Sequence, residues 1–148
     1  MIRMLGLFAM LLCTSACVSV LPSQFVAGDF DGSKPMLCTV IEASECIAGE
    51  GCQAVTPEEI NLPRFLWINV EKKTIQSTKS AEDARVSRIE GVKRFDSKLI
   101  LQGAEDGREG VRDGFGWSLA VMEDTGQVVL TASGDRFAVV AFGTCTLY

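Results

Sequence analysis

The regular spacing of short apolar segments is the feature that most constrains how this chain can fold. Eight segments rich in β-branched and aromatic residues follow one another, and turn residues separate them. Short strands at such spacing, with almost no helical pattern, indicate an antiparallel β-sandwich or a small β-barrel. We therefore predict one mostly β domain with about seven to eight strands. The segments are residues 36–44, 64–70, 73–78, 85–95, 98–103, 116–122, 127–133 and 136–143.

Apolar and polar residues alternate in the last three segments, which gives each strand one apolar face. The opposite faces of the last two segments are also partly apolar, at Val129, Val140 and Phe142. We expect these two strands at the centre of the sheet, covered on both faces. The alternating apolar positions are Trp117, Leu119, Val121, Val128, Leu130, Ala132, Phe137, Val139 and Ala141.

A helix-start signal interrupts the β pattern once. Thr56 is followed by Pro57 and, three positions on, by Glu59, which is the spacing of a capping box. Pro63 prevents the helix from continuing. The sequence predicts one short helical turn, from Thr56 to Asn61.

The N-terminus has the layout of a bacterial export signal. Arg3 precedes the apolar run 4–13, and small residues lead to Cys17 as in the lipobox cut by lipoprotein signal peptidase, with Thr14 where Leu is usual. We predict a signal peptide over residues 1–16, a lipidated Cys17 with a tether over 17–35, and a β-domain over 36–148. Cleavage by ordinary signal peptidase, giving a soluble exported protein, is the alternative. A transmembrane anchor fits less well, because the apolar run is half of the roughly 20 residues that a spanning helix needs.

The number of cysteines supports lipidation. The chain has six, and Cys13 leaves with the signal. If Cys17 carries lipid, four cysteines remain, which is an even set for disulfides in an oxidising compartment.

Four cysteines allow three pairings. We favour Cys46–Cys52, which closes a glycine-rich turn, and Cys38–Cys145, because the first and last strands of a closed sheet often meet. The combination of Cys38–Cys46 with Cys52–Cys145 is the main alternative.

The exported part is acidic, and the chain has no histidine. Removal of Arg3 leaves 13 basic residues against 19 acidic ones, a net charge of −6. This charge disfavours nucleic acid and gives no attraction to anionic lipid, so membrane attachment depends on acyl chains. Without histidine, Ser-His-Asp and Cys-His catalysis and most zinc sites are excluded. We predict no catalytic residue, no metal and no cofactor.

Acidic residues do not form an evident acid/base pair. Glu42 and Glu45 lie on opposite faces of an extended segment. The loop 105–113 could hold a cation or form part of a binding surface. Because Arg108 and Arg112 stand among its carboxylates, we expect them to neutralise these charges instead.

The remaining candidate residues are also best interpreted as structural. Trp67 and Trp117 are of the type that lines ligand pockets, but core packing is favoured. Ser118 and Ser133 have no partner base in the sequence. Residues 29–32 start like a calcium loop, yet the later ligands are missing, so we expect a polar turn.

A set of short motifs spans most of the exported part: Cys38, Glu45-Cys46, Gly51-Cys52, Thr56-Pro57-Glu58, Asn61 to Phe65, Leu101 to Gly103, Gly116-Trp117, Asp124 to Gly126 and Phe142 to Cys145. This pattern resembles an uncharacterised family of small exported or envelope proteins of Gram-negative bacteria, mainly alphaproteobacteria. The resemblance implies compartment and architecture, and it transfers no activity and no site residues. A weaker similarity is to small β-rich lipoproteins that inhibit lysozyme, whose inhibitory motif is missing here.

The sequence thus predicts a non-enzymatic envelope lipoprotein that faces the periplasm. Its disulfide-stapled β-module would bind a protein, glycan or small ligand, and its N-terminal lipid would hold it to the membrane. One alternative is a lipocalin-like carrier of a small apolar ligand, which requires an open apolar cavity. The other is a carboxylate-based hydrolase, which requires two acids that converge in one cleft.

Overall fold

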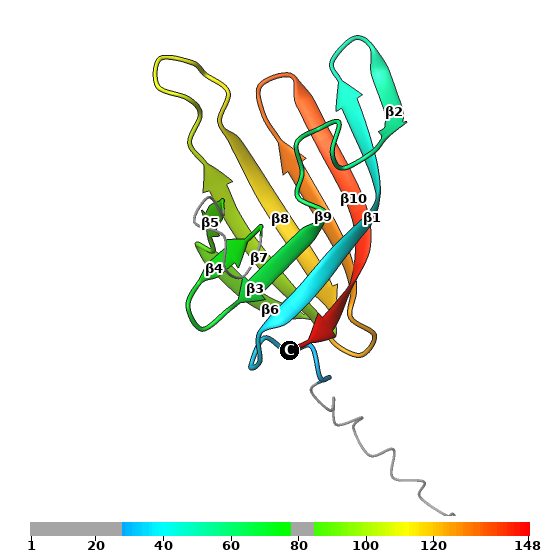
Figure 1. Cartoon of the computed structure of the whole chain (residues 1–148), viewed down its shortest axis with the longest axis vertical. Coiled ribbons are helices and arrows are strands. Elements are labelled where there is room, and N and C mark those ends of the chain that lie inside the picture. Colours follow the sequence, from blue (N-terminus) through cyan, green and yellow to red (C-terminus); the bar gives the residue numbers. More distant parts are fainter. Residues whose placement is uncertain (1–27, 78–84) are drawn as a thin grey trace, which may run out of the picture.

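The computed structural model describes residues 28–77 and 85–148, which form one antiparallel sheet of ten strands curled into a half-barrel (Figure 1). The predicted mostly β, antiparallel architecture is confirmed. The expected signal peptide and Cys17 lie outside the described residues. The strands are β1 (Met36–Ile47), β2 (Gly51–Val55), β3 (Phe65–Asn69), β4 (Thr74–Gln76), β5 (Val86–Arg88), β6 (Gly91–Phe95), β7 (Lys98–Glu105), β8 (Phe115–Met122), β9 (Gln127–Ser133) and β10 (Phe137–Leu147).

The structure has ten strands, two more than the upper end of the predicted number. The glycine-rich turn continues into β2, which pairs with the second half of β1. The segment 85–95 divides into β5, paired with β4, and β6, paired with β7. At this division the N–H of Ile89 donates to Lys73 O (2.9 Å) and that of Glu90 to Gln102 O (2.8 Å). The chain thereby crosses from one edge of the sheet to the other and draws the two edges together.

The first strand, β1, has three partners. Along one side it pairs with β10, so the first and last strands of the chain meet. Along the other side it pairs with β3 over residues 36–39 and with β2 over residues 43–47. A bulge at Ile41 separates the two regions. Beyond the bulge, β3 no longer continues the wall of the half-barrel.

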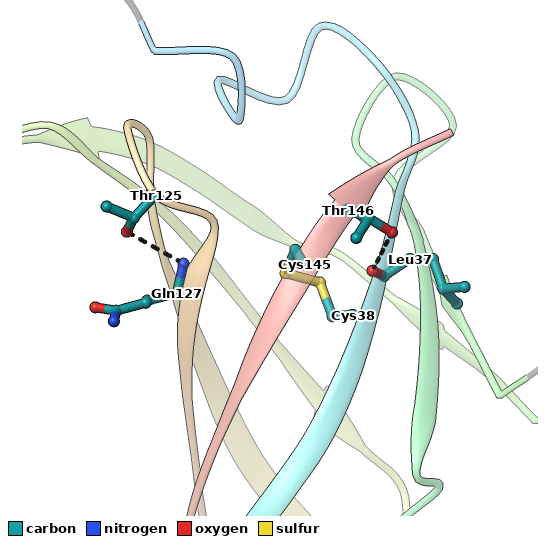
Figure 2. The surroundings of a disulfide bond; sticks show 6 residues. All are labelled: Leu37, Cys38, Thr125, Gln127, Cys145 and Thr146. Carbon is teal, nitrogen blue, oxygen red and sulfur yellow. Dashed lines mark hydrogen bonds between the residues drawn. A yellow bond between two sulfur atoms is a disulfide. The ribbon is translucent and has the colours of Figure 1, made fainter.

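Two disulfides join directly opposite residues of paired strands. Cys38 of β1 is bonded to Cys145 of β10, 107 residues away, and both are buried (Figure 2). Cys46 and Cys52 are bonded across the β1–β2 hairpin. These are the two bonds that the sequence favoured. Stable disulfides of this kind indicate an oxidising, extracytoplasmic compartment.

The inner face of the half-barrel carries the alternating apolar residues predicted for the last three strands. Most are buried, whereas Ala132 and Phe137 are half-buried. Strands β9 and β10 are central in the strand order, as predicted. Their expected burial on both faces is wrong, because Phe142 on the outer face is 47% exposed and no described element covers it.

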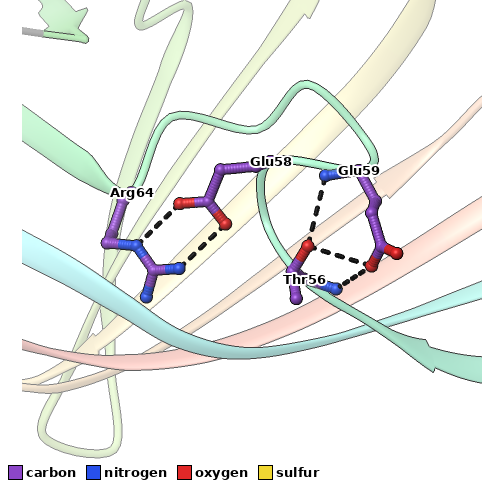
Figure 3. Close-up of polar contacts among 4 residues, drawn as sticks. All are labelled: Thr56, Glu58, Glu59 and Arg64. Atoms are coloured by element: carbon purple, nitrogen blue, oxygen red, sulfur yellow. Dashed lines mark hydrogen bonds and ion pairs between the residues drawn. The ribbon is translucent and has the colours of Figure 1, made fainter.

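The segment between β2 and β3 forms turns and no helix, which corrects the predicted helical turn. The capping box does form: Thr56 N donates to Glu59 Oε2 (2.7 Å) and Glu59 N to Thr56 Oγ1 (3.4 Å) (Figure 3). Asn61 follows at once with φ 55°. Its N–H donates to Glu58 O, and the next N–H, of Leu62, donates to Pro57 O. This is the hydrogen-bond pattern that ends a helix, so no helical residue fits between the start and the stop.

Residues 28–35, predicted as part of the tether, lie against the lower end of the half-barrel in Figure 1, beside the β8–β9 turn. Phe30 N donates to Glu123 O (3.1 Å). The guanidinium of Arg94 binds both Asp31 (2.9 Å) and the buried Glu123 (2.9 Å). Asp31 also accepts from Ser33 N (2.8 Å), so the segment is a polar turn, as expected. Ser33, together with Arg94, lowers the pKa of Asp31 to about 2.

The two disulfides differ in the length of chain that they close, so their removal has unequal effects. In the chain-entropy model, we expect the Cys38→Ala/Cys145→Ala variant to lose about 5 kcal/mol of unfolding free energy and Cys46→Ala/Cys52→Ala about 2 kcal/mol. Urea unfolding of both variants measures the difference. An equal loss in the two would contradict this account.

The Asp31 contacts predict a pH-dependent stability. Because the folded-state pKa lies below the ordinary 3.8, the contribution is complete above that pH and is lost as the pH falls toward about 2. We expect Asp31→Asn to lower the free energy of unfolding by about 1 kcal/mol at neutral pH. Thermal melting from pH 7 to pH 2 should show the gap between wild type and variant closing at low pH. The exposed Asp29→Asn serves as control, and a constant gap would disprove the assignment.

Candidate functional site

A cavity of about 790 Å³ occupies the upper half of the half-barrel. Its volume lies within the range of about 300–1,000 Å³ that is typical of small-molecule sites. The inner faces of β3, β4, β8, β9 and β10 form its floor and walls, and the β2–β3 and β7–β8 loops form its rim. Its apolar residues are Ile60, Leu62, Pro63, Leu66, Ile75, Val86, Phe115, Trp117, Leu130, Ala132, Phe137 and Val139.

Large apolar side chains fill the lower half of the interior, whereas those of the upper half line the cavity without filling it. In the lower half, Leu99, Leu101, Leu119 and Val121 are all at most 1% exposed. Farther up β7, the inward positions are held by Gly103 and Glu105 in place of large apolar residues. The interior is therefore closed at one end and hollow at the other.

The β2–β3 loop, one side of the rim, is fixed by ion pairs and hydrogen bonds. Arg64 Nε and Nη2 bind the two carboxylate oxygens of Glu58 at 2.7 and 2.8 Å (Figure 3). Arg85 Nη2 donates to the backbone oxygen of Asn61 at 2.9 Å, which ties this loop to the start of β5. These contacts hold Leu62 and its neighbours at the mouth of the cavity.

The β7–β8 loop, on the other side, is fixed by one residue pair. Arg108 donates to Asp113 from both its backbone N–H (2.7 Å) and its Nε (2.7 Å). These bonds lower the pKa of Asp113. The predicted neutralisation within this loop is confirmed for this pair, whereas the nearest acid to Arg112 is Asp135, at 4.0 Å.

Two residues that line the cavity each have a buried polar atom without a hydrogen-bond partner among the described residues: Nε1 of Trp117 and Oε1 of Glu105. Trp117 is 8% exposed. Its indole lies over Gly103 of the neighbouring strand, where a Cβ atom would come within 2.5 Å of the ring. Glycine at this position therefore allows the indole its place in the wall. Unpaired buried polar atoms are rare in folded proteins and point to a missing partner.

The structure separates most of the residues that the sequence singled out. Glu42 faces outward opposite Phe142, and Glu45 lies opposite the buried Val139, so the two lie on opposite faces, as predicted. Ser118 lies in the outward register with Thr131.

Of the two tryptophans, Trp67 packs edge-on against Tyr148, with ring centroids 4.3 Å apart. Trp117 belongs to the core, as favoured, and also lines the cavity.

Sequence reasoning considered Glu105 only as part of the loop 105–113 and favoured neutralisation of its charge over a role in binding. In the sequence it opens a loop of mixed charges, and nothing distinguishes it from its neighbours. The available signal was Gly103, since a glycine inside a strand often marks the close approach of another group.

No family model, curated protein or solved structure matches this chain. The resemblance to small envelope proteins therefore stays a prediction. Among residues 28–77 and 85–148, no helix is long and apolar enough to cross a membrane. The same residues contain no group of three or more Cys, Asp or Glu side chains arranged to hold a metal ion.

Proposed function

We propose that this protein is a non-enzymatic module of the cell envelope that binds a small, largely apolar ligand in the cavity of the half-barrel. The observation that carries the proposal is the hollow upper half, a cavity of about 790 Å³ with an apolar floor. Apolar pockets with a few well-placed polar groups are the usual form of small-molecule sites. This favours the carrier-like alternative over a module that binds a protein or glycan.

The hydrolase alternative has less support. Three acids line the cavity: Glu105, Asp106 and Asp113. Asp113 is held by Arg108 through two bonds, which keep it in its ionised form. A general acid must carry a proton at the operating pH, so Asp113 is unsuited to that role. The orphan Oε1 of Glu105 is better explained as a ligand contact.

We also propose that a lipid on Cys17 anchors the module, facing the periplasm. The two disulfides use Cys38, Cys145, Cys46 and Cys52. With Cys13 in the predicted signal, Cys17 is the cysteine of the exported part that these bonds leave over, and lipidation gives it a role. The compartment indicated by the disulfides agrees with this arrangement.

Filling the cavity is expected to abolish binding. Ala132 lies in the cavity wall, and Ala132→Phe places a ring into the hollow. We expect at least about tenfold weaker binding of the neutral apolar dye Nile red, measured by its fluorescence. Ser133→Phe is the matched control, because Ser133 is exposed and adjacent on the same strand. Equal dye binding by the two variants would rule out the cavity as the site.

The anchor is tested by Cys17→Ser. Expression with a labelled fatty acid should mark the wild type and leave the variant unlabelled, and the variant should leave the detergent phase. Cys13→Ser is the control, since that residue lies within the predicted signal. If Cys17→Ser keeps both label and partitioning, the lipid is not on Cys17.

A further inference from the structure

The two unpaired atoms belong to residues on neighbouring strands of the cavity wall. Trp117 of β8 lies opposite Gly103 of β7, and Glu105 is two residues farther along β7. The two side chains are therefore diagonal neighbours on one face of an antiparallel pair, where Cα atoms are about 7–8 Å apart. Both residues line the cavity, and both polar atoms are buried. Because both atoms have almost no accessible surface, a polar ligand group would have to part the two side chains to reach both.

The chemistry of the two atoms specifies that group. An indole N–H only donates a hydrogen bond, and a carboxylate oxygen only accepts one. A ligand that satisfies both must accept from Trp117 and donate to Glu105. An alcohol or a carboxamide does both, whereas an ammonium group can only donate.

A carboxylate head group fits poorly. It can accept from Trp117, but it has no proton to donate to Glu105, and two negative charges would face each other. The nearby cations offer little compensation. Arg108 is bound to Asp113, and Arg85 donates to Asn61.

We propose that the ligand has an apolar body and a neutral head group that both donates and accepts, and that Glu105 and Trp117 select it against fatty acids. This inference rests on the proposed function. The apolar body occupies the floor formed by residues such as Leu66 and Leu130. The head group fills the orphan positions at Glu105 Oε1 and Trp117 Nε1.

Competition against bound Nile red at pH 7 tests the selection. Decanol, decanamide, decanoate and decylamine share one chain length and differ in head group. We expect decanol and decanamide to displace the dye from the wild type at least about tenfold more effectively than decanoate or decylamine. Comparable displacement by decanoate, or a preference for decylamine, would overturn the inference.

Variants identify the residues responsible. Glu105→Gln replaces an acceptor by a side chain that also donates and removes the charge, so the preference against decanoate should fall to within about threefold. Trp117→Phe removes the donor and should weaken decanol and decanamide while leaving Nile red bound. Glu109→Gln removes the same charge from the exposed part of the same loop and should leave the preference unchanged. If Glu105→Gln keeps the wild-type preference, Glu105 does not select the head group. If the wild type binds neither dye nor competitors, the proposed function itself fails.

Discussion

Strands β1 and β10 lie side by side along almost their whole length, and the shape of the molecule depends on that pairing. It brings the two ends of the domain together and places Cys38 opposite Cys145, so that a covalent bond holds the register. On its other side, β1 exchanges partner from β3 to β2 at the bulge. The chain between those two strands must therefore arch away from β1, and this arch forms one rim of the cavity. The cavity is therefore open on this side because β1 changes its partner from β3 to β2.

The two ends of the half-barrel are stabilised in different ways. At the lower end, large aliphatic residues fill the interior, and Arg94 joins the segment before β1 to the buried Glu123. At the upper end, Trp117 is paired with two small residues: Gly103, which its indole covers, and Ala132, which lines the cavity. The period of two along each strand places both small residues on the inner face, where Gly103 makes room for the indole and the small side chain of Ala132 leaves part of the hollow unfilled. A rigid lower half therefore supports an upper half shaped for binding.

The amino-acid sequence predicted what depends on local pattern. Alternation identified the inner face of β8, β9 and β10, and the cysteines led to the pairing of the first and last strands. The sequence did not predict β2, whose residues are mostly small and form a strand through pairing with β1. The significance of Glu105 was hidden for the same reason: its position beside Trp117 follows from the register of β7 with β8 and from no feature of its own segment.

A hollow interior with unpaired polar atoms has a cost in stability. Each buried donor or acceptor without a partner destabilises the fold by about 1–3 kcal/mol, and the empty volume forfeits the packing that a filled core would provide. A domain of this size has only about 5–15 kcal/mol of net stability. The buried Cys38–Cys145 bond, by restricting the unfolded chain, contributes an amount comparable to that cost. The Cys38–Cys145 disulfide, which indicates the compartment, therefore also allows so small a domain to keep a cavity.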